Sequence, residues 1–244
     1  MSDVVTELHG SVLCIKLNRP EKKNALTFAM YDAFSDALES AAADSTIRAD
    51  VITVSGDSFC AGNDLKDFLA GSVKIDGPSP QARLIANFVK FPKPFIAAVN
   101  GITVGIGVTM LLHCDLVYAS PLARFKTGFT DLGVVPEAGS TRLLAQRVGA
   151  LNASQLFLLG DLVSASEAHH LGLINGVIED DVVSVALSKA AQIAAKSPDA
   201  VCTTKALLRS DQGTLDDVIR RENVEFSRLL ASDDFKAAAS KLVK

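Results

Sequence analysis

The stretch that decides the fold is "AAVNGITVGIGVTMLLHCDLVYAS", residues 97–120. It opens with a short apolar run that is typical of a buried strand, and it then turns through a glycine-rich segment. Residues 105–112 are apolar on every side, which is typical of a helix enclosed by the protein. Residues 115–120, "DLVYAS", predict another strand. A strand, a buried helix and a second strand in succession predict an α/β fold.

The same alternation extends upstream. Residues 11–20, "SVLCIKLNRP", and residues 50–56, "DVITVSG", predict strands. Between these strands, apolar side chains recur at every fourth position, which is helical spacing: Leu26, Met30, Phe34 and Leu38. A second apolar helix face is predicted shortly before residue 94, from Leu84, Ile85, Phe88 and Val89.

Beyond about residue 180 the pattern becomes nearly all helical. A helix is predicted over residues 181–196, where the pair Ser197-Pro198 ends it. Residues 164–167, "SASE", and residues 214–217, "TLDD", have the sequence of a capping box at a helix start. We therefore predict an α/β core over residues 1–190 and a C-terminal helical region over residues 191–244 that serves oligomerisation.

The composition is that of a globular protein with a sizeable core. The chain has 244 residues, of which 48% are hydrophobic, and its formal net charge of −4 gives no sign of a nucleic-acid partner. The four cysteines are far apart and the four histidines show no ligand spacing, so no metal site is predicted. The N-terminus lacks a secretory pattern, "KLVK" at the C-terminus is not a peroxisomal address, and no apolar run reaches the length of a membrane span. We expect a cytoplasmic protein with no membrane partner.

Two glycine-bearing stretches carry the first sign of chemistry: "FCAGNDL" (residues 59–65) and "NGITVGIG" (residues 100–107). Each follows an extended segment and leads into a helix, so each would present main-chain N–H groups that have no acceptor within the helix. Two such groups that converge on one point would stabilise an oxyanion. Taken singly, either turn is also explained by tight turning or close helix packing. A dinucleotide-binding fingerprint is disfavoured, because Met110 occupies the position of its third glycine.

Four ordered motifs carry a resemblance to a known family: "NRPEKKNAL" (residues 18–26), "FCAGNDL", the opening stretch, and "FKTGFTDLGVVPEAGSTRL" (residues 125–143). Their order and spacing resemble the crotonase (enoyl-CoA hydratase/isomerase) superfamily over most of the chain. The resemblance implies a crotonase-type ββα spiral core with a C-terminal helical subdomain, assembled as a homotrimer or a dimer of trimers. It also implies an acyl-CoA substrate, with coenzyme A as part of that substrate and no separate cofactor.

The resemblance also carries over a set of site residues. The oxyanion hole would be formed by the main-chain N–H groups of Asn63 and Ile106. Substrate and CoA binding would involve the first loop and the two glycine turns, through Lys22, Lys23, Ala25, Leu26, Ala61, Gly62, Asp64, Leu65 and Gly105. Lys22 and Lys23 could meet CoA phosphates, although lysines in a loop are commonly only solvated. Lys205 is a weaker candidate for contact with a CoA held by a neighbouring subunit.

The acids decide between the reactions of this family. Its hydratases use two glutamates that hold a water, and the matching positions here are Thr109, three residues beyond Ile106, and Phe129, seven residues before Pro136. Both carboxylates are therefore absent. The remaining acid is Glu137, in a pattern F-x-x-x-F-x-x-L-G-x-x-P-E-x-G-S that resembles the Δ3,Δ2-enoyl-CoA isomerase branch. In that branch the glutamate after the proline is the catalytic base, although Gly128 stands where many relatives have proline.

Glu137 follows an apolar run, so we expect it to be buried, with a pKa raised toward the working pH of a general base. An alternative role is that of an acid at a helix N-terminus, bonded to the amides of Ser140 or Thr141. Two alternative functions also stay open. One is another crotonase reaction, such as a hydratase or a related acyl-CoA lyase or hydrolase, with Glu137 or Asp131 handling water. The other is an acyl-CoA binder without catalysis. Structural roles are expected for Asp64, His113 and Asp115.

Overall fold

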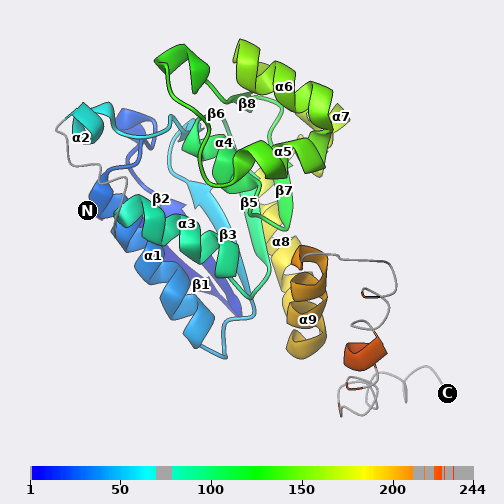
Figure 1. Cartoon of the computed structure of the whole chain (residues 1–244). Helices are drawn as coiled ribbons and strands as arrows, with labels where there is room; N and C mark the ends of the chain where they lie inside the picture. Colours follow the sequence, from blue (N-terminus) through cyan, green and yellow to red (C-terminus); the bar gives the residue numbers. More distant parts are fainter. Residues whose placement is uncertain are drawn as a thin grey trace.

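A computed structural model of the chain describes residues 2–69 and 79–210, together with 217, 223–226, 228 and 233; the side chains of residues 68 and 69 are not among the described atoms. Residues 214–216 of the predicted helix start and half of the region predicted over residues 191–244 therefore lie outside the described residues. Figure 1 shows two sheets with helices packed around them.

The larger sheet has six strands in the order β1-β2-β3-β5-β7-β10. The first pair is antiparallel and the remaining neighbours are parallel. The bounds of these strands are β1 Val4–His9, β2 Val12–Leu17, β3 Ala49–Val54, β5 Phe95–Val99, β7 Leu116–Ala119 and β10 Gly176–Val177. The smaller sheet has the order β4-β6-β8-β9, with β4 Ser58–Cys60, β6 Ile102–Val104, β8 Arg124–Lys126 and β9 Val163–Ser164.

The two sheets are built by a repeating unit of two strands and a helix. In each unit the first strand (β3, β5, β7) joins the larger sheet and the second strand (β4, β6, β8) joins the smaller one. The helices that complete the units are α3 Pro80–Lys90, α4 Ile106–Leu111 and α5 Ser140–Val148, with α2 Leu65–Leu69 and the 3₁₀ turn η2 Thr130–Leu132 inserted before α3 and α5. This arrangement matches the ββα spiral that the sequence resemblance implies.

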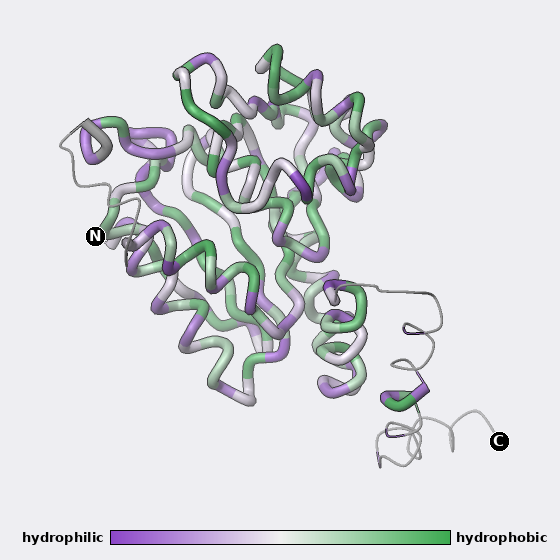
Figure 2. The backbone as a smooth tube through the Cα atoms, in the orientation of Figure 1, coloured by the Kyte–Doolittle hydropathy of each residue, from purple (hydrophilic) through white to green (hydrophobic). Residues whose placement is uncertain are grey.

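The centre of the larger sheet is covered on both faces, which explains why every residue of β3 and β5 is buried. Helices α1 Phe28–Ala43 and α3 lie side by side on one face, and α8 Val182–Ala194 packs on the other (Figure 1). Along β5, Phe95, Ala97 and Val99 belong to the core cluster that includes α1 and α3, whereas Ile96 and Ala98 belong to the cluster with α8. Figure 2 shows this as apolar strands enclosed by helices of mixed hydropathy.

The remaining elements are the 3₁₀ turn η1 Pro20–Lys22, α6 Ala150–Leu159, α7 Ala165–His170 and α9 Pro198–Arg209. The predicted capping box at Ser164 is present, because the Ser164 hydroxyl accepts from the Glu167 N–H and the Glu167 carboxylate accepts from the Ser164 N–H. Helix α8 begins after the cap Asp181 and runs across the predicted boundary at residue 190, so that boundary and the oligomerisation role of residues 191–244 stay predictions. Within the described part of the chain, no helix combines the length and the apolar character needed to cross a membrane.

Two details of the sequence interpretation need correction. Strand β1 was not predicted, because only Val4 of its six residues is buried and it shows no apolar alternation. Val89 was assigned to the apolar face of its helix, but its residue is 59% exposed, whereas Leu84 and Phe88 on the same helix are buried.

Candidate active site

Three neighbouring strands of the smaller sheet end at the same edge. Strands β4, β6 and β8 are parallel, so their carboxyl ends lie together. The segments that follow them are residues 61–64, residues 105–106 and the loop that leads to Glu137. The Gly105 N–H donates to the Lys126 carbonyl at 3.0 Å, which ties the second segment to the third. Ligand sites in open parallel sheets are commonly found at this edge.

The two glycine turns are in contact. Gly62 and Gly105 have φ of +100° and +56°, values that a residue with a side chain rarely adopts. A Cβ built on Gly105 would lie 3.9 Å from the Gly62 Cα, so the turns approach to van der Waals distance. A Cβ on Gly107 would lie 2.8 Å from the Cys60 carbonyl oxygen, so glycine is also needed where α4 crosses β4. The sequence motifs therefore converge in space.

The predicted oxyanion donors are open at this point. Neither the Asn63 nor the Ile106 main-chain N–H donates to an acceptor within the described residues. On either side of Asn63, the chain is fixed to Leu26: the Leu26 N–H donates to the Gly62 carbonyl and the Asp64 N–H donates to the Leu26 carbonyl, each at 2.8 Å. Ile106 is the first residue of α4, where a main-chain N–H has no intrahelical acceptor. The main chain around both amides is thus fixed, and both N–H groups remain without an acceptor among the described residues.

Glu137 turns toward α4. The Thr109 hydroxyl, one helical turn beyond Ile106, donates a hydrogen bond to the Glu137 carboxylate. Glu137 was expected to be buried and is half-buried, and the reason for its burial differs from the one expected. The apolar residues before it, Leu132, Val134 and Val135, are more than half exposed, at 65%, 53% and 81%. The burial comes instead from the turn that directs the carboxylate onto α4.

The structure agrees only in part with the alternative role of Glu137 as an acid at a helix N-terminus. The Ser140 N–H donates to the Glu137 carbonyl at 3.0 Å, which is a main-chain contact. The carboxylate itself is bonded by Thr109 from another helix. Burial raises the pKa of Glu137, and the hydrogen bond from Thr109 opposes that rise without cancelling it.

A tyrosine that the sequence interpretation did not single out completes this group. Tyr31 in α1 is 2% exposed, and its hydroxyl donates to the Asn63 side-chain oxygen. Burial, followed by the charge of Glu137, raises the pKa of Tyr31, so this phenol stays protonated. Its only signal in the sequence is a polar tip on the apolar side of a helix, which does not reveal the partner.

The two positions that carry glutamates in the family's hydratases hold no acid here. Thr109 is the hydroxyl partner of Glu137, as described above. Phe129 is 7% exposed and packs on Phe157, with ring centroids 6.4 Å apart. Asp131, the other acid considered for water activation, forms an ion pair with Lys126 at 2.8 Å.

The loop assigned to CoA binding lies against the first glycine turn. Lys22 and Lys23 are exposed at the end of η1, and the Lys23 carbonyl accepts from the Ala61 N–H at 2.9 Å. Ala25 is half-buried, and Leu26 is buried against the Gly62–Asp64 segment described above. The structure therefore brings the predicted loop beside Asn63.

Asp64 and Leu65 are also predicted to bind CoA, but their contacts differ from those of the loop described above. The Asp64 carboxylate accepts from the Lys66 N–H at 2.9 Å, as expected for a helix cap, and it pairs with Arg19 at 2.8 Å. Leu65 is 56% exposed at the start of α2. Their contact with CoA stays a prediction.

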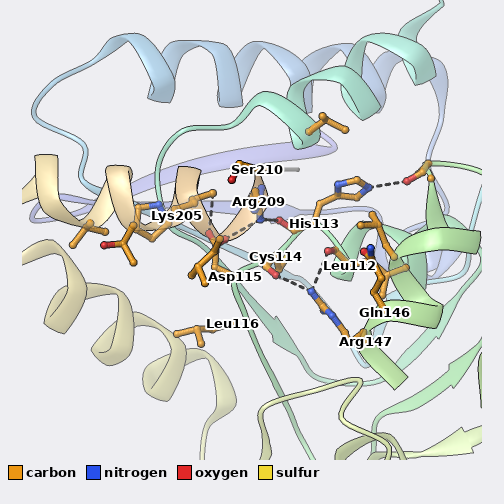
Figure 3. Close-up of a pocket in the computed structure, with 18 of the residues that line it drawn as sticks. Leu112, His113, Cys114, Asp115, Leu116, Gln146, Arg147, Lys205, Arg209 and Ser210 are labelled. Atoms are coloured by element: carbon orange, nitrogen blue, oxygen red, sulfur yellow. Dashed lines mark hydrogen bonds and ion pairs between the residues drawn. The ribbon is translucent and has the colours of Figure 1, made fainter. Parts of the chain in front are cut away.

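An open groove of about 1490 Å³ lies at the other end of α4 (Figure 3). Lys205 and Arg209 of α9 reach Asp115 there, each at 2.8 Å, and Asp115 also accepts from the Phe95 N–H. Asp115 is structural, as predicted. Lys205 is 7% exposed, and its ammonium group already pairs with Asp115 and donates to the Lys93 carbonyl. These contacts argue against the predicted contact with a CoA held by a neighbouring subunit.

The comparisons with known proteins identify the family of the chain. The family model described as "Enoyl-CoA hydratase/isomerase" matches residues 7–243. The chain is 37% identical to the 2,3-dehydroadipyl-CoA hydratase of Escherichia coli, over 96% of this chain and 92% of that protein. It is 34% identical to enoyl-CoA delta isomerase 2 of Rattus norvegicus, over 86% of this chain and 55% of that protein. A solved structure described as a putative enoyl-CoA hydratase/carnithine racemase from Magnetospirillum magneticum superposes with a TM-score of 0.95 at 37% identity, covering 99% of this chain and 96% of that one.

The family model covers nearly the whole chain, and the solved structure from Magnetospirillum magneticum shares the fold. The names of the relatives are mixed between hydratases and isomerases, so they fix the family and leave the reaction open. The chain therefore belongs to the enoyl-CoA hydratase/isomerase family, the crotonase superfamily.

Proposed function

We propose that this chain is a Δ3,Δ2-enoyl-CoA isomerase, which moves a double bond from C3 to C2 of an acyl-CoA thioester. The observation that carries the proposal is a single acid, Glu137, held by Thr109 within one helical turn of Ile106. A shift of a double bond needs one base and no water, whereas hydration in this family uses two glutamates. Thr109 and Phe129 occupy the positions of that pair.

The thioester oxygen would lie between the Asn63 and Ile106 amides. Glu137 takes a proton from C2, and the electrons of that C–H bond delocalise over C2–C4 and the thioester oxygen as a dienolate. Two main-chain donors stabilise the negative charge on the oxygen, a contribution of roughly 10²–10³ in rate for each donor in comparable sites. Protonated Glu137 then returns the proton to C4, which leaves the conjugated double bond between C2 and C3 and restores the carboxylate.

The electrostatics support Glu137 as the base. Its raised pKa lies closer to the working pH than that of an exposed glutamate, which strengthens it as a proton acceptor. The hydrogen bond from Thr109 stabilises the ionised form, so the carboxylate is ready to accept a proton before the substrate arrives. Lys22 and Lys23, exposed beside the first glycine turn, are proposed to meet the phosphates of CoA.

The test is an assay of 3-enoyl-CoA esters of several chain lengths, followed by the ultraviolet absorbance of the conjugated 2-enoyl thioester. Glu137→Gln should lower kcat by about 10²–10⁴, the range for loss of a general base, while acyl-CoA binding measured by calorimetry persists. Asp131→Asn is the matched control, because this neighbouring acid pairs with Lys126 and should leave kcat unchanged.

The alternatives have distinct outcomes in the same experiment. Hydration of crotonyl-CoA without any isomerisation of 3-enoyl-CoA would assign a hydratase and reject the proposal. Tight acyl-CoA binding with neither reaction would indicate a binder without catalysis. An active Glu137→Gln variant would remove Glu137 from the mechanism.

A further inference from the structure

The turn that carries Glu137 is unusual in its backbone. Ala138 has a φ of +56°, which is left-handed and uncommon for a residue with a side chain. Gly139 follows with a φ of +67°, and a Cβ built on it would meet nothing within 4 Å. The preceding loop is exposed at Leu132, Val134 and Val135. Ala138 itself is 8% exposed, but the segments on either side of it are open to solvent, so a hydrogen bond from another element helps to keep the left-handed turn and Glu137 in place.

His113 provides such a tie. Its ring Nε2 lies 2.9 Å from the Ala138 carbonyl oxygen. A carbonyl oxygen only accepts, so this ring nitrogen must carry the hydrogen. His113 is 6% exposed and stacks on Phe88 of α3, with ring centroids 5.9 Å apart, so the ring has a fixed plane. Its own carbonyl accepts from Arg209, which fixes the main chain at this point as well.

Thr109 and His113 are four positions apart, in α4 and in the turn that continues it. Although this part of the chain is a tight turn, both side chains reach the same segment, residues 137–138. Thr109 bonds the Glu137 carboxylate, and His113 bonds the carbonyl of the next residue along the chain. The carboxylate and the peptide that follows it are thus held from one side of one element. Loss of the second bond would leave the left-handed Ala138 free to relax.

We propose that His113 is a positioning residue for Glu137: through the Ala138 carbonyl it holds the left-handed turn that aims the carboxylate at the substrate. The inference rests on the proposed role of Glu137 as the base. His113 does not reach the reacting atoms and takes no part in proton transfer. Its burial lowers the pKa of its ring, so it is a neutral donor at neutral pH, which suits a hydrogen bond to a carbonyl.

The variants that test this are a matched pair. His113→Phe keeps an aromatic ring on Phe88 but has no N–H. His113→Gln loses the ring but keeps an N–H donor near the position of Nε2. We expect His113→Phe to lower kcat for 3-enoyl-CoA about tenfold with KM changed less than about twofold, because small displacements of a reacting group cost rate and leave substrate binding intact. His113→Gln should recover most of kcat.

A second readout does not depend on the reaction. The ¹³C carboxyl signal of Glu137, assigned by its loss in Glu137→Gln, is titrated in the wild-type protein and in both His113 variants. In His113→Phe the pKa of Glu137 should fall toward that of an ordinary glutamate, because the relaxed turn exposes the carboxylate. In His113→Gln it should stay raised.

The outcomes separate this inference from the proposed function. An unchanged Glu137 titration and an unchanged kcat in His113→Phe would overturn the positioning role. Equal losses of kcat in both variants that track lower melting temperatures would also overturn it, because they indicate a purely structural role. A fall in the Glu137 pKa in a protein that does not isomerise 3-enoyl-CoA would keep the positioning role and reject the proposed function.

Discussion

The two ends of α4 differ in whether their free main-chain groups are hydrogen-bonded by the rest of the protein. At the N-terminal end, glycines flank Ile106 on both sides, and its N–H has no acceptor within the described residues. At the C-terminal end, the carbonyls of the last residues are saturated by arginine side chains. Arg147 donates to Leu111, Leu112 and Cys114 at 2.9, 3.0 and 3.3 Å, and Arg209 donates to His113.

The difference agrees with the proposal that the N-terminal end of α4 binds the substrate. Every helix leaves main-chain groups without intrahelical partners at its ends, and buried ones cost free energy when nothing bonds them. Here the acceptors are satisfied by protein and the donors are left for something else. We therefore expect changes at the N-terminal end of α4 to reduce rate and loss of the arginines at the C-terminal end to reduce stability. The His113 ring is the exception at the C-terminal end, because it bonds the Ala138 carbonyl next to Glu137.

The largest effect is expected at the N-terminal end, from Gly105→Ala. Gly105 has φ 56° and ψ −119°, a combination that is strained for alanine, so the turn must shift and move the Ile106 N–H. Misplacing one oxyanion donor should lower kcat for 3-enoyl-CoA by about 10²–10³. Steady-state kinetics below the melting temperature measure this.

Gly149→Ala is the control for backbone strain alone. Gly149 also has a positive φ, of +82°, but it joins α5 to α6, away from the glycine turns. Its substitution should lower the melting temperature and leave kcat unchanged. Full activity in Gly105→Ala would contradict the role assigned to the N-terminal end of α4.

The second effect concerns the other end. Arg147→Met keeps the apolar length of the side chain and removes all three hydrogen bonds to the carbonyls at the end of α4 and just beyond it. Burial lowers the pKa of Arg147, so the guanidinium itself is costly to bury, and the net loss should be about 2 kcal/mol. For a chain of this size that corresponds to a melting temperature lower by about 4–8 °C, with kcat changed less than about threefold.

Arg83→Met is the matched comparison for Arg147. Arg83 pairs with Asp32, Asp36 and Glu39, but all three carboxylates are exposed. Exposed ion pairs contribute little, so this substitution should change stability by less than about 1 kcal/mol. A loss of kcat well above threefold in Arg147→Met, with a melting temperature close to that of the wild type, would contradict the contrast between the two ends of α4.

The contrast also explains what the sequence could predict. Gly62 and Gly105 are required by local backbone geometry, so their motifs were visible along the chain, and Glu137 was visible as an acid in a fixed place after them. The strands β2, β3, β5 and β7 were predicted because their burial follows from continuous apolar runs. The fold could therefore be predicted without the structure, and the roles of Asn63, Ile106 and Glu137 stay predictions.

The partners of those residues could not be predicted, because they meet across long separations. The hydroxyl of Thr109 is 28 positions from Glu137, and Tyr31 is 32 positions from Asn63. Hydropathy patterns do not show such pairs. Asp50 is a further example: its strand was predicted, but its carboxylate is fully buried with no hydrogen bond among the described residues, and burial raises its pKa to about 7.

The smallest effect is expected in the middle of α4, from Thr109→Val. Thr109 is 1% exposed, and valine matches its shape without the hydroxyl that bonds Glu137. That bond lowers the pKa of Glu137 against the effect of burial, so its loss should raise this pKa further. The base is active only when ionised, so the acid limb of the kcat/KM profile should move to higher pH, and kcat at neutral pH should fall about tenfold.

Thr109→Ser keeps the hydroxyl and should hold the acid limb near its wild-type position. The measurement is the pH dependence of kcat/KM for one 3-enoyl-CoA ester in all three proteins. Movement of the acid limb to lower pH in Thr109→Val would mean that the hydroxyl stabilises the protonated form of Glu137. In that case Thr109 would not prepare the base. The ionised form of Glu137 would then depend on groups outside this helix, and the contribution of α4 would be limited to the Ile106 N–H that is proposed to bind the thioester oxygen.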